Sequence, residues 1–331
     1  MTRVLGQGSV GLFVDNPDHV KRISELADST WPGRVPVVVK IAAEVPFRAG
    51  LSPESETLDV IADLIAKSPK IQLVGTYAHL GNSYASSSPA EALEFLTHEI
   101  KAVQAGADRI AKATAPSADK LVISLGATPT ITSAQNILED TPWNKNFRAQ
   151  LEQVKQTYEV EFHAGVYPVL DMQQLATRAR PSSTGEKSLL APENLALRVM
   201  VEVASVYAER ENPEALVGAG SIVLGREPCK SYPGWGVVTP WTQDDSKDGP
   251  FYDPEGSKTG WIVGRISQEH GTLVWEGPQE NMRSLELGEK LMVWPNHACM
   301  AGPGFGFYLV VDSESDERDV VRDVWVRWRG W

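Results

Sequence analysis

An imidazole and a thiol lie two residues apart near the end of the chain, in Trp294-Pro295-Asn296-His297-Ala298-Cys299. The apolar run before them predicts a buried strand that ends in a loop. Successive strand side chains alternate between faces, so His297 and Cys299 point the same way if the strand continues. Imidazole and thiolate are preferred zinc ligands, and a catalytic zinc keeps a position open for water or substrate. The pair alone is weak evidence, because a buried cysteine beside a hydrogen-bonded core histidine is the commoner arrangement.

A second group of polar side chains lies in Tyr77-Ala78-His79-Leu80-Gly81-Asn82-Ser83-Tyr84, where a predicted strand ends. The C-terminal edge of a parallel sheet is where α/β proteins place their active sites. Hydroxyl, imidazole and amide groups at that edge suit contacts with a cofactor or substrate. A strand end whose polar groups hydrogen-bond locally explains them equally well.

Small residues follow the next predicted strand, in Ser124-Leu125-Gly126-Ala127-Thr128-Pro129-Thr130. Such a loop lets backbone N–H groups close on an anion, although glycine-containing turns after strands are common. Lys40 ends another strand and is a weak candidate for a lysine that forms a Schiff base. For His163, at the end of the last strand of this region, we favour a structural hydrogen bond.

The first half of the sequence alternates short apolar runs with helical patterns, which together would position these residues. We predict strands at 10–14, 35–41, 71–78, 120–124 and 160–163, and helices at 17–27, 54–67 and 89–113. This alternation indicates βαβ units in a parallel sheet with both faces covered. Five strands fall short of the eight in a closed barrel, so the region is either a doubly wound sheet or an incomplete barrel.

The second half of the sequence is typical of an antiparallel β domain. Residues 195–207 have the length of a helix, but Val199, Val201 and Val203 alternate with period two, which favours a strand. Short apolar strands separated by glycines and prolines follow from about residue 215. A loop-like stretch at 178–185 sets the expected boundary between one domain over 1–185 and another over 186–331.

Composition narrows the classes of function. The chain has 331 residues, 42% of them hydrophobic, which is enough for two cores. Its net charge of −12, without a basic cluster, argues against nucleic acid and anionic membranes as partners. No apolar run has the length of a spanning helix, and the N-terminus has no signal-peptide pattern. We therefore expect a cytoplasmic protein with reduced Cys229 and Cys299.

The amino-acid sequences of these motifs resemble those of the eukaryotic-type D-serine dehydratase family. The segment Pro295-Asn296-His297-Ala298-Cys299 is similar to the zinc motif of that family, and residues 77–84 are similar to its Y-A-H-x-G-N-x-Y motif. Residues 124–129 resemble its S-x-G-x-T-P loop, with Ala127 where a serine is more usual, and residues 161–167 resemble its E-x-x-x-G-x-Y segment. The motifs run in family order from about residue 10 to residue 331.

The resemblance implies an α/β protein with an alanine-racemase-like (β/α)8 barrel, here with about five βα units, followed by an antiparallel β domain. It implies conversion of D-serine to pyruvate and ammonia in a homodimer, with zinc assisting loss of the β-hydroxyl group. It further implies zinc on His297 and Cys299, and pyridoxal 5′-phosphate bound by Tyr77, Tyr84, Gly126, Ala127, Thr128 and Tyr167.

The sequence departs from the family pattern at its start. Members carry the cofactor lysine in an early strand, in an H-x-K-T-H-K-like context, and we expect this lysine and about three βα units to be missing here. One alternative is therefore a catalytically inactive or truncated dehydratase-like protein. Another is an activity like that of D-threonine aldolase or D-threo-3-hydroxyaspartate dehydratase. A thiolate ligand favours zinc and the dehydratase, because the aldolase branch prefers harder carboxylate ligands.

Overall fold

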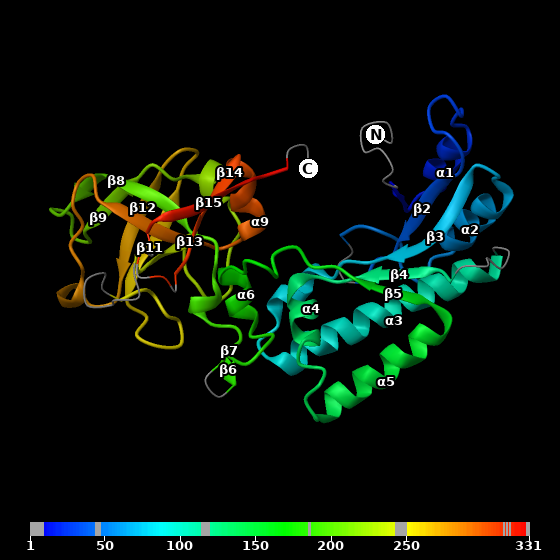
Figure 1. Ribbon diagram of the computed structural model, residues 1–331, viewed down its shortest axis with the longest axis horizontal. Helices are drawn as coiled ribbons and strands as arrows, with labels where there is room; N and C mark the ends of the chain where they lie inside the picture. The colour runs from blue at the N-terminus through cyan, green and yellow to red at the C-terminus, as the bar shows by residue number, and fades with distance from the viewer. Residues whose placement is uncertain are drawn as a thin grey trace. The chain divides into compact units, whose positions relative to one another are not determined.

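The computed structural model describes residues 10–43, 48–113, 120–184, 187–241, 250–313, 315, 317 and 319–328. The chain divides into two compact units (Figure 1). Unit 1 comprises Met1–Gly165 and Thr177–Pro181. Unit 2 comprises Val166–Ala176 and Ser182–Trp331. The chain therefore passes from unit 1 to unit 2 and back before it enters the β-rich half.

Unit 1 contains a five-stranded parallel sheet whose spatial order, β1-β2-β3-β4-β5, equals the order along the chain. A doubly wound sheet reverses its order at a switch point. Among the described strands there is no such reversal, so the topology is that of an arc of a (β/α) barrel. The strands are β1 Leu12–Val14, β2 Val35–Lys40, β3 Ile71–Tyr77, β4 Val122–Leu125 and β5 Glu159–Phe162.

Right-handed crossovers between strands in this order place the connecting helices on one face of the sheet. Val35, Val37 and Val39 of β2 are fully buried, whereas Pro36, Val38 and Lys40 on its other face are only half-buried. Phe13, the neighbour of Val38 in β1, is 57% exposed. The expectation that both faces are covered is therefore wrong for this part of the sheet.

The helices are α1 Pro17–Ser24, α2 Thr57–Lys67, η1 Gly81–Ala85, α3 Pro89–Ala113, α4 Thr128–Ala134 and α5 Pro142–Thr157.

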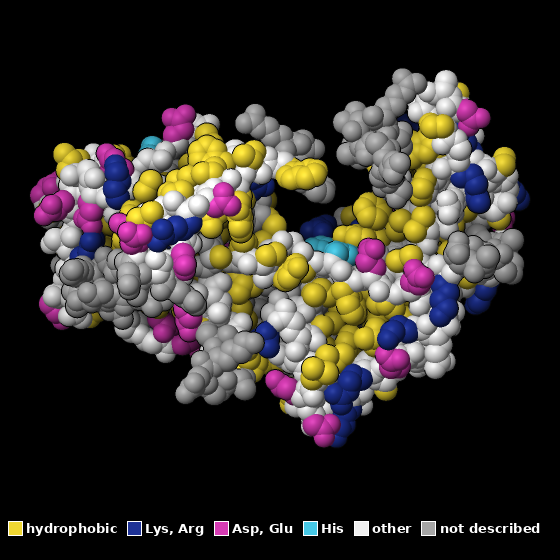
Figure 2. All heavy atoms as spheres, viewed as in Figure 1, with side chains coloured by type: hydrophobic (Ala, Val, Ile, Leu, Met, Phe, Trp, Pro, Cys, Tyr) yellow, Lys and Arg dark blue, Asp and Glu magenta, His cyan; other side chains and the backbone are white. Residues whose placement is uncertain are grey.

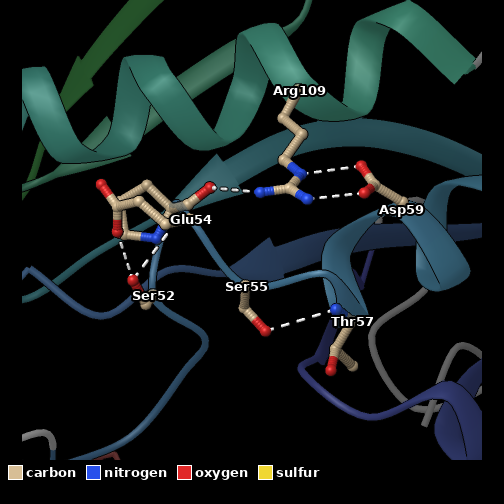
Figure 3. Close-up of polar contacts among 7 residues, drawn as sticks. Ser52, Glu54, Ser55, Thr57, Asp59 and Arg109 are labelled. Atoms are coloured by element: carbon tan, nitrogen blue, oxygen red, sulfur yellow. Dashed lines mark hydrogen bonds and ion pairs between the residues drawn. The ribbon is translucent and has the colours of Figure 1, made fainter.

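The long helix α3 connects the helical layer to the sheet. At Gly106, an added Cβ would come within 2.5 Å of the Cδ1 atom of Ile41, so a larger residue would require the Ile41 side chain to shift. Arg109 donates two hydrogen bonds, of 2.7 and 2.6 Å, to the carboxylate of Asp59 in α2 (Figure 3). Its guanidinium group also donates to the carbonyl of Pro53 at 3.4 Å. These contacts hold the N-terminal turn of α2 against α3.

Unit 2 contains a closed antiparallel barrel with the strand order β10-β11-β12-β9-β8-β13. Closure leaves the barrel without free strand edges. Val199, Val201 and Val203 are buried and alternate with exposed residues, so the predicted strand in this region is confirmed. The barrel strands are β8 Val199–Tyr207, β9 Glu214–Val217, β10 Gly236–Thr239, β11 Gly260–Ile266, β12 Gly271–Glu276 and β13 Lys290–Pro295.

A two-stranded ribbon, β14 Phe307–Val311 with β15 Val321–Val326, follows the barrel. One face of this ribbon is apolar, and Figure 2 shows apolar side chains gathered at the surface over β14 and β15. Five exposed residues that share this face are Phe307, Leu309, Val311, Val324 and Val326.

The remaining short elements of this half are α6 Met172–Thr177, β6 Ser183–Thr184, β7 Lys187–Ser188, η2 Pro192–Asn194, α7 Ser221–Leu224, η3 Gln279–Asn281, α9 Ala298–Ala301 and η4 Gly302–Gly304. None of the helices in the described ranges is long and apolar enough to cross a membrane.

Candidate functional site

Three strand ends meet at one edge of the sheet in unit 1. Tyr77 of β3 pairs with Ser124 of β4, which in turn pairs with Glu161 of β5. The Tyr77 ring stacks on the His163 ring, with centroids 4.6 Å apart and planes at 7°. Lys40 places its Nζ atom 4.6 Å from the centroid of Tyr77. The predicted gathering of polar and aromatic groups at this edge is thus present, and we call it the strand-end cluster.

His163 lies at the centre of the strand-end cluster. Its Nδ1 atom is 3.3 Å from the hydroxyl of Ser124, which donates a 2.6 Å hydrogen bond to Glu161. Burial lowers the pKa of His163 from 6.5 to about 4, and the nearby His79 and Lys40 add to this shift. No hydrogen bond of normal geometry reaches its buried Nε2 atom from the described part of the chain, although hydrogen bonding to the backbone of Gly126 opposes the pKa shift. The imidazole is therefore neutral at neutral pH, and Nε2 is a buried polar atom that a ligand would have to reach.

Tyr77 has a raised pKa, because it is partly buried and because the carboxylate of Glu99 disfavours a phenolate nearby. Its hydroxyl group is therefore protonated throughout the neutral range. The His79 ring lies 6.4 Å from that of His163, and its Nδ1 atom is 2.9 Å from the carbonyl oxygen of Gly126. A carbonyl oxygen only accepts, so the proton of His79 sits on Nδ1.

The loop after β4 is wholly buried and tightly held. The N–H group of Gly126 donates to Glu99 of α3 at 3.2 Å, and that of Ala127 donates to the hydroxyl of Thr130 at 3.0 Å. Gly126 has φ of +138°, and an added Cβ would come within 2.4 Å of the carbonyl oxygen of His163. Thr128 begins α4 and is buried. The N–H groups of Gly126 and Ala127 are thus engaged within the chain, and phosphate binding by this loop stays a prediction.

The other two predicted cofactor residues occupy different places. Tyr84 lies in the short helix η1, directly after the strand-end cluster, and is half-buried. Tyr167 belongs to unit 2 and is 55% exposed. The structure therefore gathers Tyr77, Gly126, Ala127 and Thr128 in unit 1, and it does not assign Tyr167 to the same unit.

The His297–Cys299 segment of unit 2 follows β13, which ends at Pro295. His297 is the N-cap of α9, and Cys299 lies inside that helix. The strand does not continue, so the expected strand alternation of the two side chains is wrong. A turn of helix replaces it because the carbonyl of His297 accepts hydrogen bonds from Met300 and Ala301, both at 3.1 Å.

Buried groups fix the backbone of the His297–Cys299 segment. Asn296 is buried, and its side chain donates to the carbonyls of Glu227 and Gly234 at 3.0 and 2.9 Å. Asp171 is also buried and accepts from the N–H of Ala298 at 2.8 Å and from the N–H of Gln174 at 3.0 Å. Burial raises the pKa of Asp171, and its hydrogen bonds with backbone N–H groups oppose that shift. Asp171 therefore caps α9 from a position 127 residues earlier in the sequence.

Gln173 fixes the His297 ring itself. The Nδ1 atom of His297 makes a short hydrogen bond with the side-chain oxygen of Gln173. An amide oxygen only accepts, so Nδ1 is the donor in this hydrogen bond. A metal-binding histidine is usually oriented in this way by an acceptor on its other nitrogen.

Cys299 presents its side chain at the protein surface. Desolvation by the surrounding atoms and the nearby Asp171 nevertheless raise the pKa of its thiol, against a weaker opposing effect of Arg327. Across the described residues, no group of three or more His, Cys, Asp and Glu side chains is arranged to hold a metal ion.

Three residues in these two sites were not identified from the sequence. Glu99 lies on the apolar face of α3, between Leu96 and Val103, and a charge at such a position was a usable signal. Asp171 and Gln173 gave no comparable signal, because their partners lie more than 120 residues away in the sequence. His163 was interpreted as structural; it does contact Ser124, but it also carries the buried Nε2 atom.

Comparison with known proteins gives matches along most of the chain. Residues 3–142 match the family model described as "Alanine racemase, N-terminal domain", and residues 196–311 match the one described as "Putative serine dehydratase domain". The chain is 32% identical over 327 residues to the D-serine dehydratase of Schizosaccharomyces pombe, covering 97% of this chain and 67% of that protein. It is 31% identical over 325 residues to the D-serine dehydratase of Saccharomyces cerevisiae, covering 97% and 68%.

A third relative is the D-threo-3-hydroxyaspartate dehydratase of Delftia, which is 27% identical over 267 residues, covering 79% of this chain and 57% of that protein. Its solved structure superposes with a TM-score of 0.68 at 21% identity, covering 99% of this chain and 74% of that one. At that identity the structural likeness shows the fold, which is alanine-racemase-like as predicted.

Proposed function

The chain belongs to the D-serine dehydratase family, and from that membership we propose that it is a pyridoxal-phosphate- and zinc-dependent dehydratase of D-serine. The products are pyruvate and ammonia. The observation that carries the proposal is the His297–Cys299 segment, whose backbone and imidazole are fixed by Asp171 and Gln173. A segment that served only to pack the end of a barrel strand would not need a buried carboxylate and an oriented imidazole.

The donor set of this segment fits zinc. Imidazole nitrogen and thiolate sulfur are both preferred ligands of that ion, and the hydrogen bond to Gln173 orients the His297 ring. Zinc, when bound, supplies Lewis acidity that helps a β-hydroxyl group leave. The surface position of Cys299 keeps the sulfur accessible to an incoming ion. A variant of a D-threo-3-hydroxyaspartate dehydratase has been solved in a metal-free form, which is consistent with a metal in the normal form of that enzyme.

The strand-end cluster of unit 1 fits a planar anionic cofactor. The buried Nε2 atom of His163 offers a polar contact, and the hydroxyl groups near it come from Tyr77 and Ser124. Pyridoxal phosphate, when bound, supplies an electron sink for the carbanion at Cα. We propose Tyr77, Tyr84, Gly126, Ala127, Thr128 and Tyr167 as the residues that hold it.

The chain's own groups would set the polarity of that site. His163 stays neutral at pH 7, because its pKa is about 4, and so adds no positive charge beside the cofactor ring. The raised pKa of Tyr77 keeps its hydroxyl a hydrogen-bond donor. Lys40 lies over the Tyr77 ring and adds a cation at the same sheet edge, where it favours an anionic ligand.

The test is pyruvate release from D-serine by the full chain supplied with pyridoxal phosphate and zinc. We expect turnover by the wild type, loss of at least about 100-fold in Cys299→Ala, and little change in Cys229→Ala. Cys229 is the matched control, because it is the other cysteine and lies in the same unit. Borohydride trapping with peptide mapping identifies which lysine, Lys40 or another, bonds to the cofactor. Cofactor and zinc uptake without pyruvate would instead support the catalytically inactive alternative.

A second candidate substrate is D-threo-3-hydroxyaspartate, which the match to the Delftia enzyme favours. Both substrates carry a β-hydroxyl group, so the same zinc chemistry serves either. Comparing kcat/KM for D-serine, D-threonine and D-threo-3-hydroxyaspartate ranks them. A higher value for D-threo-3-hydroxyaspartate would replace D-serine as the substrate, and retro-aldol cleavage of D-threonine would favour the aldolase alternative.

We further propose a homodimer, which the family resemblance implies. The exposed apolar face of the β14–β15 ribbon supports this, because two strands with an open apolar face are only marginally stable alone. Leu309→Lys is expected to shift sedimentation velocity from dimer toward monomer. Leu287→Lys, at another exposed leucine of unit 2, is the control. A monomeric wild type at micromolar concentration would contradict the proposal. A cytoplasmic location stays a prediction.

A further inference from the structure

Glu99 lies in the middle of α3 with none of its surface exposed. One oxygen, Oε1, accepts hydrogen bonds from the N–H of Leu80 at 2.9 Å and from the N–H of Gly126 at 3.2 Å. Leu80 follows β3, and Gly126 follows β4. A single carboxylate oxygen therefore joins the loops that leave two neighbouring strands.

Packing does not explain a glutamate at this position. Leu96 and Val103, one helical turn to either side on the same face of α3, are both fully buried in an apolar cluster. Burying a carboxylate there is costly unless hydrogen bonds compensate for the lost hydration. The two backbone N–H groups supply part of that compensation, at Oε1, and without Glu99 they would themselves lack this acceptor. The position of Glu99 is therefore explained by the backbone groups that it holds.

The same helix fastens the sheet at two further places. The carbonyl of Val103 accepts a 3.3 Å hydrogen bond from the hydroxyl of Thr76 in β3, and Gly106 lies against Ile41 just after β2. Glu99, Val103 and Gly106 follow one another at about one-turn spacing. Figure 1 shows α3 running alongside the sheet of unit 1. Glu99 thus acts from a rigid support that is itself fixed to the strands.

A closed ring of contacts joins the two loops. Gly126 is held at its N–H by Glu99 and at its carbonyl by the Nδ1 atom of His79. His79 is bonded in sequence to Leu80, whose N–H returns to Glu99. Neither loop can move relative to the other without breaking a hydrogen bond in this ring. Tyr77 and Tyr84 lie on the first loop and its approach, whereas Ala127 and Thr128 lie on the second.

We propose that Glu99 is a positioning residue that sets the spacing of the two strand-end loops and thereby shapes the cofactor site between them. The inference rests on the proposed function, because it assigns cofactor binding to these loops. To act in this way, Glu99 needs an acceptor oxygen at the distance from α3 that a glutamate side chain spans. It does not need a negative charge.

Two substitutions separate reach from charge. Glu99→Gln keeps an oxygen at the same distance and removes the charge. Glu99→Asp keeps the charge and shortens the side chain by one methylene, so its oxygen no longer reaches both N–H groups. Leu96→Ala, on the same buried face one turn away, is the control for general loosening of α3.

The measurements are amide hydrogen exchange at Leu80 and Gly126 in the cofactor-free chain, and the Kd for pyridoxal phosphate by fluorescence titration. For Glu99→Asp we expect about tenfold faster exchange at both amides and about tenfold weaker binding of pyridoxal phosphate. A tenfold change corresponds to the loss of roughly one net hydrogen bond. Glu99→Gln is expected within about threefold of the wild type in both. Leu96→Ala is expected to unfold at lower urea while both amides keep their relative protection.

If Glu99→Asp shows the amide exchange rates and the pyridoxal phosphate affinity of the wild type, the inference is overturned. It is also overturned if Glu99→Gln loses as much protection and affinity as Glu99→Asp, because that result would assign the role to charge. The failure of the proposed function is recognised separately. If the wild type takes up no pyridoxal phosphate, that function fails, while exchange at Leu80 and Gly126 still decides whether Glu99 holds the two loops together.

Discussion

The strand-end cluster of unit 1 and the His297–Cys299 segment of unit 2 differ in how far their chemical groups are exposed. In unit 1 Tyr77 stacks on His163, the Nδ1 atom of His163 lies 3.3 Å from the hydroxyl of Ser124, and the loop after β4 is buried. In unit 2 Asp171 holds the backbone and Gln173 holds the His297 ring, whereas Cys299 is exposed. The first arrangement suits a group that stays bound, and the second suits an ion that exchanges ligands with substrate.

The largest expected effect comes from adding one methyl group to the unit 1 loop. In Gly126→Ala, the Cβ would come within 2.4 Å of the carbonyl oxygen of His163, and φ of +138° is strained for alanine. We expect the free energy of unfolding to fall by about 3 kcal/mol or more. Gly218→Ala in unit 2, whose Cβ would meet nothing within 4 Å, should change it by less than about 1 kcal/mol. Urea unfolding measures both, and equal effects would remove the contrast between the two sites.

Asp171 provides the corresponding test in unit 2. Asp171→Ala leaves the N–H groups of Ala298 and Gln174 without their acceptor, which should cost about 2–3 kcal/mol of unfolding free energy. It should also weaken zinc binding about tenfold or more, because the His297–Cys299 backbone is no longer fixed. Calorimetric zinc titration measures the second effect. If the variant still folds and its zinc affinity is unchanged, the hydrogen bonds of Asp171 to the backbone do not contribute to metal binding.

The smallest effect concerns pH. Folded His163 binds a proton only near pH 4, whereas an unfolded histidine binds it near 6.5. Between these values the unfolded chain holds more protons, so the free energy of unfolding should fall as the pH is lowered from 6.5 toward 4. Allowing for solvent screening, we expect a contribution of about 1–2 kcal/mol. His163→Asn should lack this part of the slope in urea titrations at several pH values, and a slope identical to the wild type would contradict the assignment.

Strong periodicity made some elements predictable to the residue. Helix α3 begins and ends at Pro89 and Ala113 as predicted, because its apolar residues recur along one face for its whole length. The short apolar strands predicted beyond residue 215 include β14, Phe307–Val311. Helix α5, Pro142–Thr157, was not predicted, because few of its residues are buried. Its start was nevertheless readable, since the Thr141 side chain caps it and Pro142 occupies its first position.

The candidate site was predictable only in part, and for a physical reason. Motif residues such as Tyr77, His79 and His297 could be placed at strand ends, because a strand end is a local property of the sequence. Their supports were not predictable, because Asp171 meets Ala298 across 127 residues and Glu99 meets Gly126 across 27. The sequence also did not predict the turn of helix at Cys299, because a four-residue helix is too short to show a periodic pattern of apolar residues.

D-serine turnover before and after metal removal tests most directly whether dehydration depends on a metal held by His297 and Cys299. The chain loaded with pyridoxal phosphate is assayed for pyruvate, treated with a chelator, and assayed again after stoichiometric zinc is restored. We expect activity to fall by at least about 100-fold on chelation and to return with zinc in the wild type, but not in a His297→Ala, Cys299→Ala double variant. Full activity in the chelated wild type would contradict a dehydratase whose metal rests on His297 and Cys299.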